Sequence, residues 1–111
     1  MRQHPLVGER ILRASPALRN VATIVRSTHE RWDGAGYPDG LAGHEIPVAS
    51  RIISACDAFT AMTSARPYRV ALTTEEALAK LERVAGVQFD PAVVSVLAAH
   101  VRDGLRVEHS A

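Results

Sequence analysis

Three side chains that suit metal binding are spread along this sequence: His4, His29 and Asp57. Imidazole nitrogens and carboxylate oxygens are ligands of divalent transition metals. Their spacing matches no short-range signature such as H-x-x-x-H, so only the fold can bring them together. Asp57 has apolar neighbours in the sequence, including Cys56 and Phe59. They predict a buried or half-buried carboxylate, which needs a cation, hydrogen bonds or a metal. The alternative stays open, because a histidine at a helix end is often a cap or surface residue and a mid-helix aspartate is often exposed.

A second group is basic. Arg66 and Arg69 are three positions apart and flank Pro67 and Tyr68. A tight bend there would point both guanidinium groups one way, and two such groups can grip a phosphate through charge-assisted hydrogen bonds. The alternative is a basic cluster that complements the dipole at a helix C-terminus.

Residues 33–43 hold four of the seven glycines of the chain. That density excludes a helix or strand and predicts a loop of about a dozen residues, a length that is usually functional or disordered. Trp32 and Tyr37 argue for an ordered loop, because large aromatic rings are packed or used.

These candidates must be positioned by helices, because apolar residues recur at helical spacing and alternating strand patterns are absent. Thr73 followed by Glu76 is typical of a capping box, and Gly86 of a helix C-terminus. The predicted fold is all-α with about five helices and one ordered loop between the second and third. The predicted helices are residues 5–14, 17–28, 47–64, 73–86 and 91–104, and we expect residues 105–111 to form a flexible tail.

Composition limits the class of protein. A chain of 111 residues with 47% hydrophobic residues and a net charge of +1 fits one globular domain and argues against a nucleic-acid polymer as partner. No apolar run reaches the ~20 residues that span a bilayer. Cys56 is the single cysteine, so no internal disulfide can form, and we expect the protein to work in the reducing cytoplasm. Aromatic residues make up only 5%, so Leu, Val, Ile and Ala must form the core.

Taken together, the ordered motifs resemble the C-terminal part of the HD-GYP family, over residues 1–104. The signature tripeptide is Gly36-Tyr37-Pro38, within a block that begins at His29 and Glu30. The other matching blocks are His4-Pro5 with Gly8, Ile46-Pro47, Arg51-Ile52, Asp57-Ala58-Phe59, Arg66-Pro67-Tyr68-Arg69 and Phe89-Asp90-Pro91.

The resemblance implies a partial helical bundle of the HD superfamily of metal-dependent phosphohydrolases. Its members hydrolyse cyclic di-GMP or related cyclic dinucleotides with iron or manganese ions, which activate water and stabilise the leaving oxygen. By position, His4, His29 and Asp57 match metal ligands, while Arg66 and Arg69 match a pair that contacts the substrate phosphate. Tyr37 matches a residue beside the substrate, and Gly34, Gly36 and Pro38 would shape the signature loop.

Departures from the family pattern qualify the expected activity. The His-Asp pair that names the family is absent from this chain, and Thr28 and Thr60 stand where the family has His and often Asp. A threonine hydroxyl is a poor ligand for these metals. We therefore expect a truncated phosphodiesterase, inactive alone.

Two other hypotheses remain. The chain could be a non-catalytic module that binds a nucleotide or a signalling protein such as a diguanylate cyclase, or a helical remnant without function. If upstream helices are missing, exposed apolar faces would also favour self-association.

Overall fold

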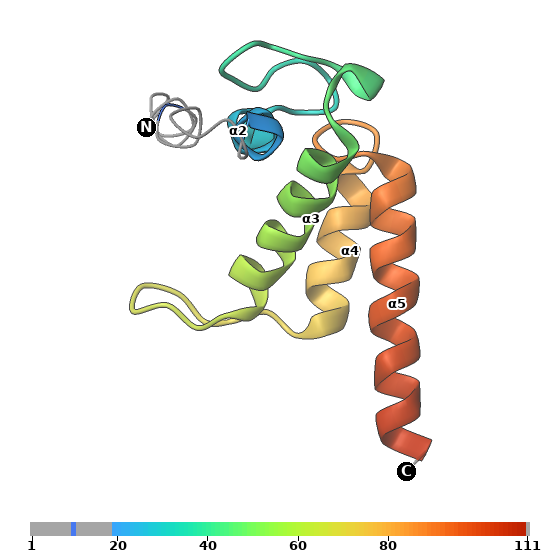
Figure 1. Cartoon of the computed structure of the whole chain (residues 1–111). Helices are drawn as coiled ribbons and strands as arrows, with labels where there is room; N and C mark the ends of the chain where they lie inside the picture. Colours follow the sequence, from blue (N-terminus) through green and yellow to red (C-terminus); the bar gives the residue numbers. More distant parts are fainter. Residues whose placement is uncertain (1–9, 11–18, 111) are drawn as a thin grey trace.

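The computed structural model describes residue 10 and residues 19–110, and these form helices and loops (Figure 1). The elements are α2 (Arg19–Arg26), the 3-10 turn η2 (Ser27–His29), the 3-10 turn η3 (Gly43–Glu45), α3 (Val48–Thr63), α4 (Thr74–Val84) and α5 (Pro91–Ser110). The all-α prediction is confirmed for this part of the chain. The predicted helix at residues 5–14 lies outside it, apart from Arg10, which is helical.

The core lies where α3, α4 and α5 pack side by side (Figure 1). Its buried centre is formed by Ala55, Leu81, Phe89 and Val94. Half-buried Ala58, Phe59, Met62, Val84, Ala85, Val93 and Leu97 pack around that centre. The expected aliphatic core is present, and Phe89 adds one aromatic ring to it.

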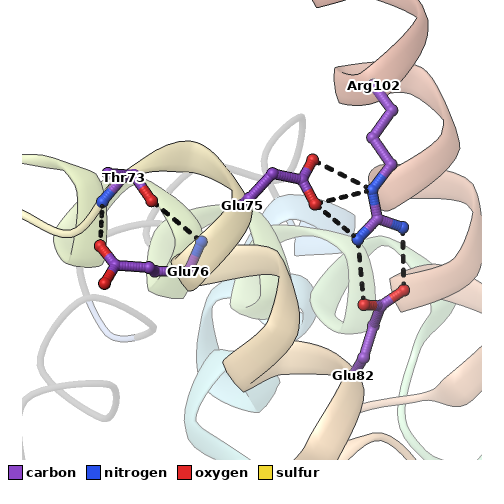
Figure 2. A network of polar contacts seen from close by, with 5 residues as sticks. All are labelled: Thr73, Glu75, Glu76, Glu82 and Arg102. Carbon is purple, nitrogen blue, oxygen red and sulfur yellow. Dashed lines mark hydrogen bonds and ion pairs between the residues drawn. The ribbon is translucent and has the colours of Figure 1, made fainter.

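Helix boundaries follow their sequence signals closely in α3 and α4. Pro47 precedes α3. Thr73 and Glu76 form the predicted capping box, with each side chain accepting a backbone N–H of the other residue (Figure 2). Gly86 has a φ of 86° just beyond α4, a conformation that L side chains rarely adopt. The sequence signals therefore define the α3–α4 framework.

The last helix differs from the prediction. α5 continues through Gly104 to Ser110 instead of ending near Gly104, so this boundary was wrong. Within α5, Arg102 bonds to Glu75 and Glu82 of α4, with nitrogen–oxygen distances of 3.1–3.3 Å (Figure 2). This network holds the helix against α4 just before the glycine, where a helix can tolerate glycine at a cost of about 1 kcal/mol.

Some predicted apolar faces are only partly covered. In α3, Ala55 is buried, whereas Val48 and Ile52 stay exposed, and on α5 Val96 is exposed as well. Val48, Ile52 and Val96 border a groove of about 420 Å³ between α3 and α5. Among the described residues no helix has both the length and the apolar character required to cross a membrane.

Candidate active site

The Gly-rich loop, defined here as residues 30–42 between η2 and η3, is organised by a buried carboxylate. Glu30 is 4% exposed. Its Oε2 accepts the backbone N–H of Asp39 at 2.9 Å, and its Oε1 accepts that of Leu41 at 3.1 Å. A side chain at the start of the loop thus satisfies two backbone donors at its far end, where no regular element supplies acceptors.

Gly36 lies where the loop folds back on its own beginning. A Cβ atom on Gly36 would lie 2.5 Å from His29 O and Arg31 N and 2.7 Å from Glu30 Cα. The next residue, Tyr37, donates its backbone N–H to His29 O at 3.3 Å. The missing side chain of Gly36 is therefore what allows Tyr37 to reach His29.

This close approach brings two predicted site residues together. The rings of His29 and Tyr37 are stacked, with centroids 5.2 Å apart and planes inclined by 4°. Separation and inclination are those of an offset stack. The peptide bond between Tyr37 and Pro38 is cis.

A polar hollow of about 380 Å³ opens beside the stack. It is lined by Thr28, His29, Glu30, Arg31, Ala35, Gly36, Tyr37, Ser54 and Gln88, so α3 and the α4–α5 turn contribute as well as the loop. A hollow with an aromatic platform, a guanidinium group, a hydroxyl and an amide can hold a planar polar ligand through stacking and hydrogen bonds.

Two surface ion pairs fix the outside of the loop. The Arg26 guanidinium of α2 donates two hydrogen bonds of 2.8 Å to the Asp39 carboxylate. The Arg31 guanidinium donates to the Asp33 carboxylate at 3.0 and 3.2 Å. The hydrogen bond from Arg26 lowers the pKa of Asp39. The hydrogen bond from Arg31, helped by the backbone N–H of Ala35, lowers the pKa of Asp33. Both carboxylates therefore stay ionised at neutral pH.

Asp57 is exposed, so the expectation of a buried or half-buried carboxylate was wrong. The physical reason is helical geometry. Ala55 faces the core, and two residues further along an α-helix the side chain direction has turned by about 200°. Asp57 therefore points away from α4 and α5 despite its apolar neighbours.

Arg66 and Arg69 lie in a tight turn after α3. Each donates its backbone N–H to the other's carbonyl, at 3.2 and 3.3 Å, with Pro67 and Tyr68 between them. The side chains of directly paired residues in an antiparallel bridge project to the same side. The predicted binding of one phosphate by both guanidinium groups requires this arrangement. The Arg69 guanidinium also donates to the carbonyl of Ala61, which holds it along α3.

The Gly-rich loop and the arginine turn lie at opposite ends of α3 (Figure 1). One side of α3 connects them, because Ser54, Asp57 and Ala61 follow each other at i, i+3 and i+7. Ser54 lines the hollow and Ala61 binds Arg69. The predicted residues thus form a track of about 10 Å along the helix rather than a single cluster.

The described residues do not by themselves make a metal centre. Among residues 10 and 19–110, no group of three or more His, Cys, Asp or Glu side chains could hold a metal ion. His29 and Asp57 are both exposed, and His4 lies outside the described residues. The Thr28 hydroxyl donates to the carbonyl of Val25 at 2.9 Å. The donor set of the described residues is therefore incomplete for a metal.

Comparison with known proteins identifies the family. The sequence profile of the HD domain matches residues 1–93. The chain belongs to the HD domain family. The match confirms the expected family, and the helices described above confirm the expected fold. HD-domain phosphohydrolases are generally metal-dependent, but the metal and its ligands stay predictions.

Relatives of this HD domain are phosphodiesterases. It is 45% identical over 96 residues to a cyclic di-GMP phosphodiesterase of Thermotoga maritima, covering 85% of this chain and 26% of that protein. It is 44% identical over 99 residues to the cyclic di-GMP phosphodiesterase response regulator RpfG of Xanthomonas campestris, covering 87% and 26%. The chain thus spans about a quarter of the length of these relatives.

A solved structure agrees in fold. A cyclic GMP-AMP specific phosphodiesterase of Vibrio cholerae superposes on the HD domain with a TM-score of 0.79 at 29% identity. The superposition covers 91% of this chain and 23% of the Vibrio chain.

Several residues of the site were missed from the sequence, among them Ser54, Gln88, Arg31 and Glu30. Ser54 and Gln88 line the hollow, and Glu30 closes the loop. Glu30 directly follows a predicted ligand, which is a weak signal. Nothing local marks Ser54 or Gln88, because their roles depend on how α3 and the α4–α5 turn pack.

Proposed function

We propose that this HD domain is part of a phosphohydrolase that acts on a cyclic dinucleotide, and that these 111 residues bind the ligand without completing its hydrolysis. The observation that carries the proposal is the track on α3, with an aromatic-lined polar hollow at one end and two arginines at the other. The activity named for the relatives supports the ligand class.

The two ends of the track suit two parts of such a ligand. A nucleobase is planar and polar, and it can lie against the ring stack of His29 and Tyr37 within the hollow. A phosphodiester carries one negative charge, which Arg66 and Arg69 can meet with charge-assisted hydrogen bonds. A cyclic dinucleotide joins bases and phosphates in one molecule, so it can engage both ends at once.

Hydrolysis needs groups beyond those described. On the family resemblance, we propose iron or manganese as the metal of the intact domain, with His4, His29 and Asp57 as the ligands from this chain. The 111 residues contain no adjacent His-Asp pair. A metal held by fewer ligands is bound more weakly, and binding without turnover is the expected behaviour.

The test measures binding and turnover separately. Calorimetry of the 111-residue chain with cyclic di-GMP is expected to show binding, and Arg66→Ala with Arg69→Ala should weaken it at least about tenfold. Arg83→Ala, at an exposed arginine of α4, is the matched control and should leave the affinity unchanged. Incubation with manganese or iron should give no linear product. Turnover equal to that of an intact relative would refute the incomplete centre, and absence of binding would refute the ligand class.

A non-catalytic signalling module is the second candidate. The observation that favours it is Thr28, which stands where the family resemblance leads us to expect a histidine. The Thr28 hydroxyl donates to the carbonyl of Val25 instead. A longer form of the protein that contains the upstream His-Asp pair and still gives no turnover with manganese would support this candidate over the phosphohydrolase.

A further inference from the structure

We propose that Glu30 is a positioning residue of this site: its buried carboxylate holds Tyr37 in place over His29. The part of the inference that concerns the ligand rests on the proposed function. Both carboxylate oxygens of Glu30 accept backbone N–H groups of the loop. Glu30 therefore acts on a ligand through Tyr37.

The first step is that the loop closes on Glu30 from two directions. Gly36 and Tyr37 lie against the backbone of residues 29–31, because a Cβ on Gly36 would be 2.7 Å from the Cα of Glu30. Asp39 and Leu41, beyond Pro38, bond to the Glu30 side chain. Tyr37 is therefore held between two points that both belong to residues 29–31.

The second step is that a carboxylate is required. Asp39 and Leu41 donate to different oxygens of Glu30. A glutamine has one acceptor oxygen and one NH₂ group, so one of these backbone N–H groups would face a donor. A buried donor without an acceptor loses more than an ordinary hydrogen bond contributes. Glu30→Gln should therefore open the loop although it preserves size.

The third step is that two neighbouring carboxylate contacts of the loop do not replace Glu30. Arg26 holds the Asp39 side chain at the surface, and Glu45 accepts the N–H of Ala42 at the end of the loop. Neither bond reaches Leu41 or Tyr37. The two bonds at Glu30 therefore add to the bond from the Tyr37 N–H to His29 O in holding the ring stack.

The experiment follows the His29 ring protons by NMR. In the wild-type chain the stacked Tyr37 ring should shift them, and Tyr37→Leu defines the unstacked position. Glu30→Gln is expected to move the His29 signals to that position and to weaken cyclic di-GMP binding at least about tenfold. Glu45→Gln is the matched control: among the described residues that carboxylate accepts through Oε1 alone, which glutamine keeps, so the signals and the affinity should stay unchanged.

Each outcome decides. His29 signals that stay at the wild-type position in Glu30→Gln would overturn the inference, whatever the ligand does. If Glu30→Gln loses its helical circular dichroism, Leu41→Pro, which removes only one of the two donors, provides the same test. A wild-type chain that binds no cyclic di-GMP would refute the proposed function, and the His29 signals would still decide the role of Glu30.

Discussion

Arg51 and Asp90, 39 residues apart, form a largely buried ion pair with Nη1 2.7 Å from Oδ2. Arg51 also donates to the carbonyl of Ile46, and Asp90 accepts the N–H of Ala92 in the first turn of α5. One pair of side chains thus joins the segment after the Gly-rich loop to the start of the last helix. A buried carboxylate and a half-buried guanidinium group thus hold this corner of the fold.

Loss of one partner should be costly. Asp90→Asn is expected to lower the free energy of unfolding by about 3 kcal/mol, because the Arg51 charge stays buried without its partner. Urea denaturation followed by circular dichroism measures the change. The double variant Arg51→Gln with Asp90→Asn should recover part of the loss, and a single-variant effect below about 0.5 kcal/mol would contradict the role of the pair.

The same pair predicts an acid dependence. Burial acts to raise the pKa of Asp90, but hydrogen bonds from Arg51 and from the backbone N–H of Ala92 outweigh it, so the pKa lies below the ordinary 3.8. A lowered folded-state pKa stabilises the fold above the ordinary value and loses that contribution as pH falls through the folded value. The stability difference between wild type and Asp90→Asn should therefore be constant near neutral pH and shrink below about pH 4.

Gly36→Ala should disrupt the loop, because the new Cβ would overlap backbone atoms that cannot move independently. We expect loss of the Tyr37 signal in near-ultraviolet circular dichroism and loss of cyclic di-GMP binding. Gly43→Ala is the control: it meets no atom within 4 Å and costs only the strain of its φ of 56°, about 1 kcal/mol. Equal behaviour of the two variants would contradict the close approach at Gly36.

Gly104→Ala is expected to stabilise the protein by about 0.5–1 kcal/mol, since alanine loses less backbone entropy in a helix and meets no atom within 4 Å. Thermal unfolding should show a higher midpoint. A lower midpoint would mean that α5 does not continue through this residue.

Arg102→Ala should lower the melting temperature slightly at low salt and leave it unchanged in 1 M NaCl. The guanidinium group and its partners Glu75 and Glu82 are exposed, so salt screens their attraction. Lys80→Ala on the exposed face of α4 is the control. A salt-independent loss would show that Arg102 acts through packing of its alkyl chain.

Local signals predicted much of the fold. Pro47 before α3 and the Thr73–Glu76 capping box before α4 act within one turn of the helix they start, so the sequence alone is sufficient. The predicted end of α5 at Gly104 was wrong because a glycine is a helix stop signal when it takes a left-handed conformation just beyond the helix. Gly86 does so, and Gly104 has no positive φ.

The site was harder to predict because its geometry is long-range. Recognition of the signature loop supplied Tyr37 and His29, and the structure brings them together. The exposure of Asp57 depends on which side of α3 receives α4 and α5, which its immediate neighbours do not encode. Likewise, Glu30 owes its role to backbone donors nine and eleven residues away.

Two main-chain hydrogen bonds also join the Gly-rich loop to the α4–α5 turn: Trp32 donates to the carbonyl of Gln88 at 3.1 Å and Asp33 to that of Val87 at 2.9 Å. Main-chain acceptors are indifferent to side-chain identity, so residues 87 and 88 are free to vary in type without affecting these bonds. Their number is not free, because one inserted residue would displace the acceptors by up to 3.8 Å. The length of this connection is thus as much a part of the loop's specification as Gly36, Tyr37 and Pro38.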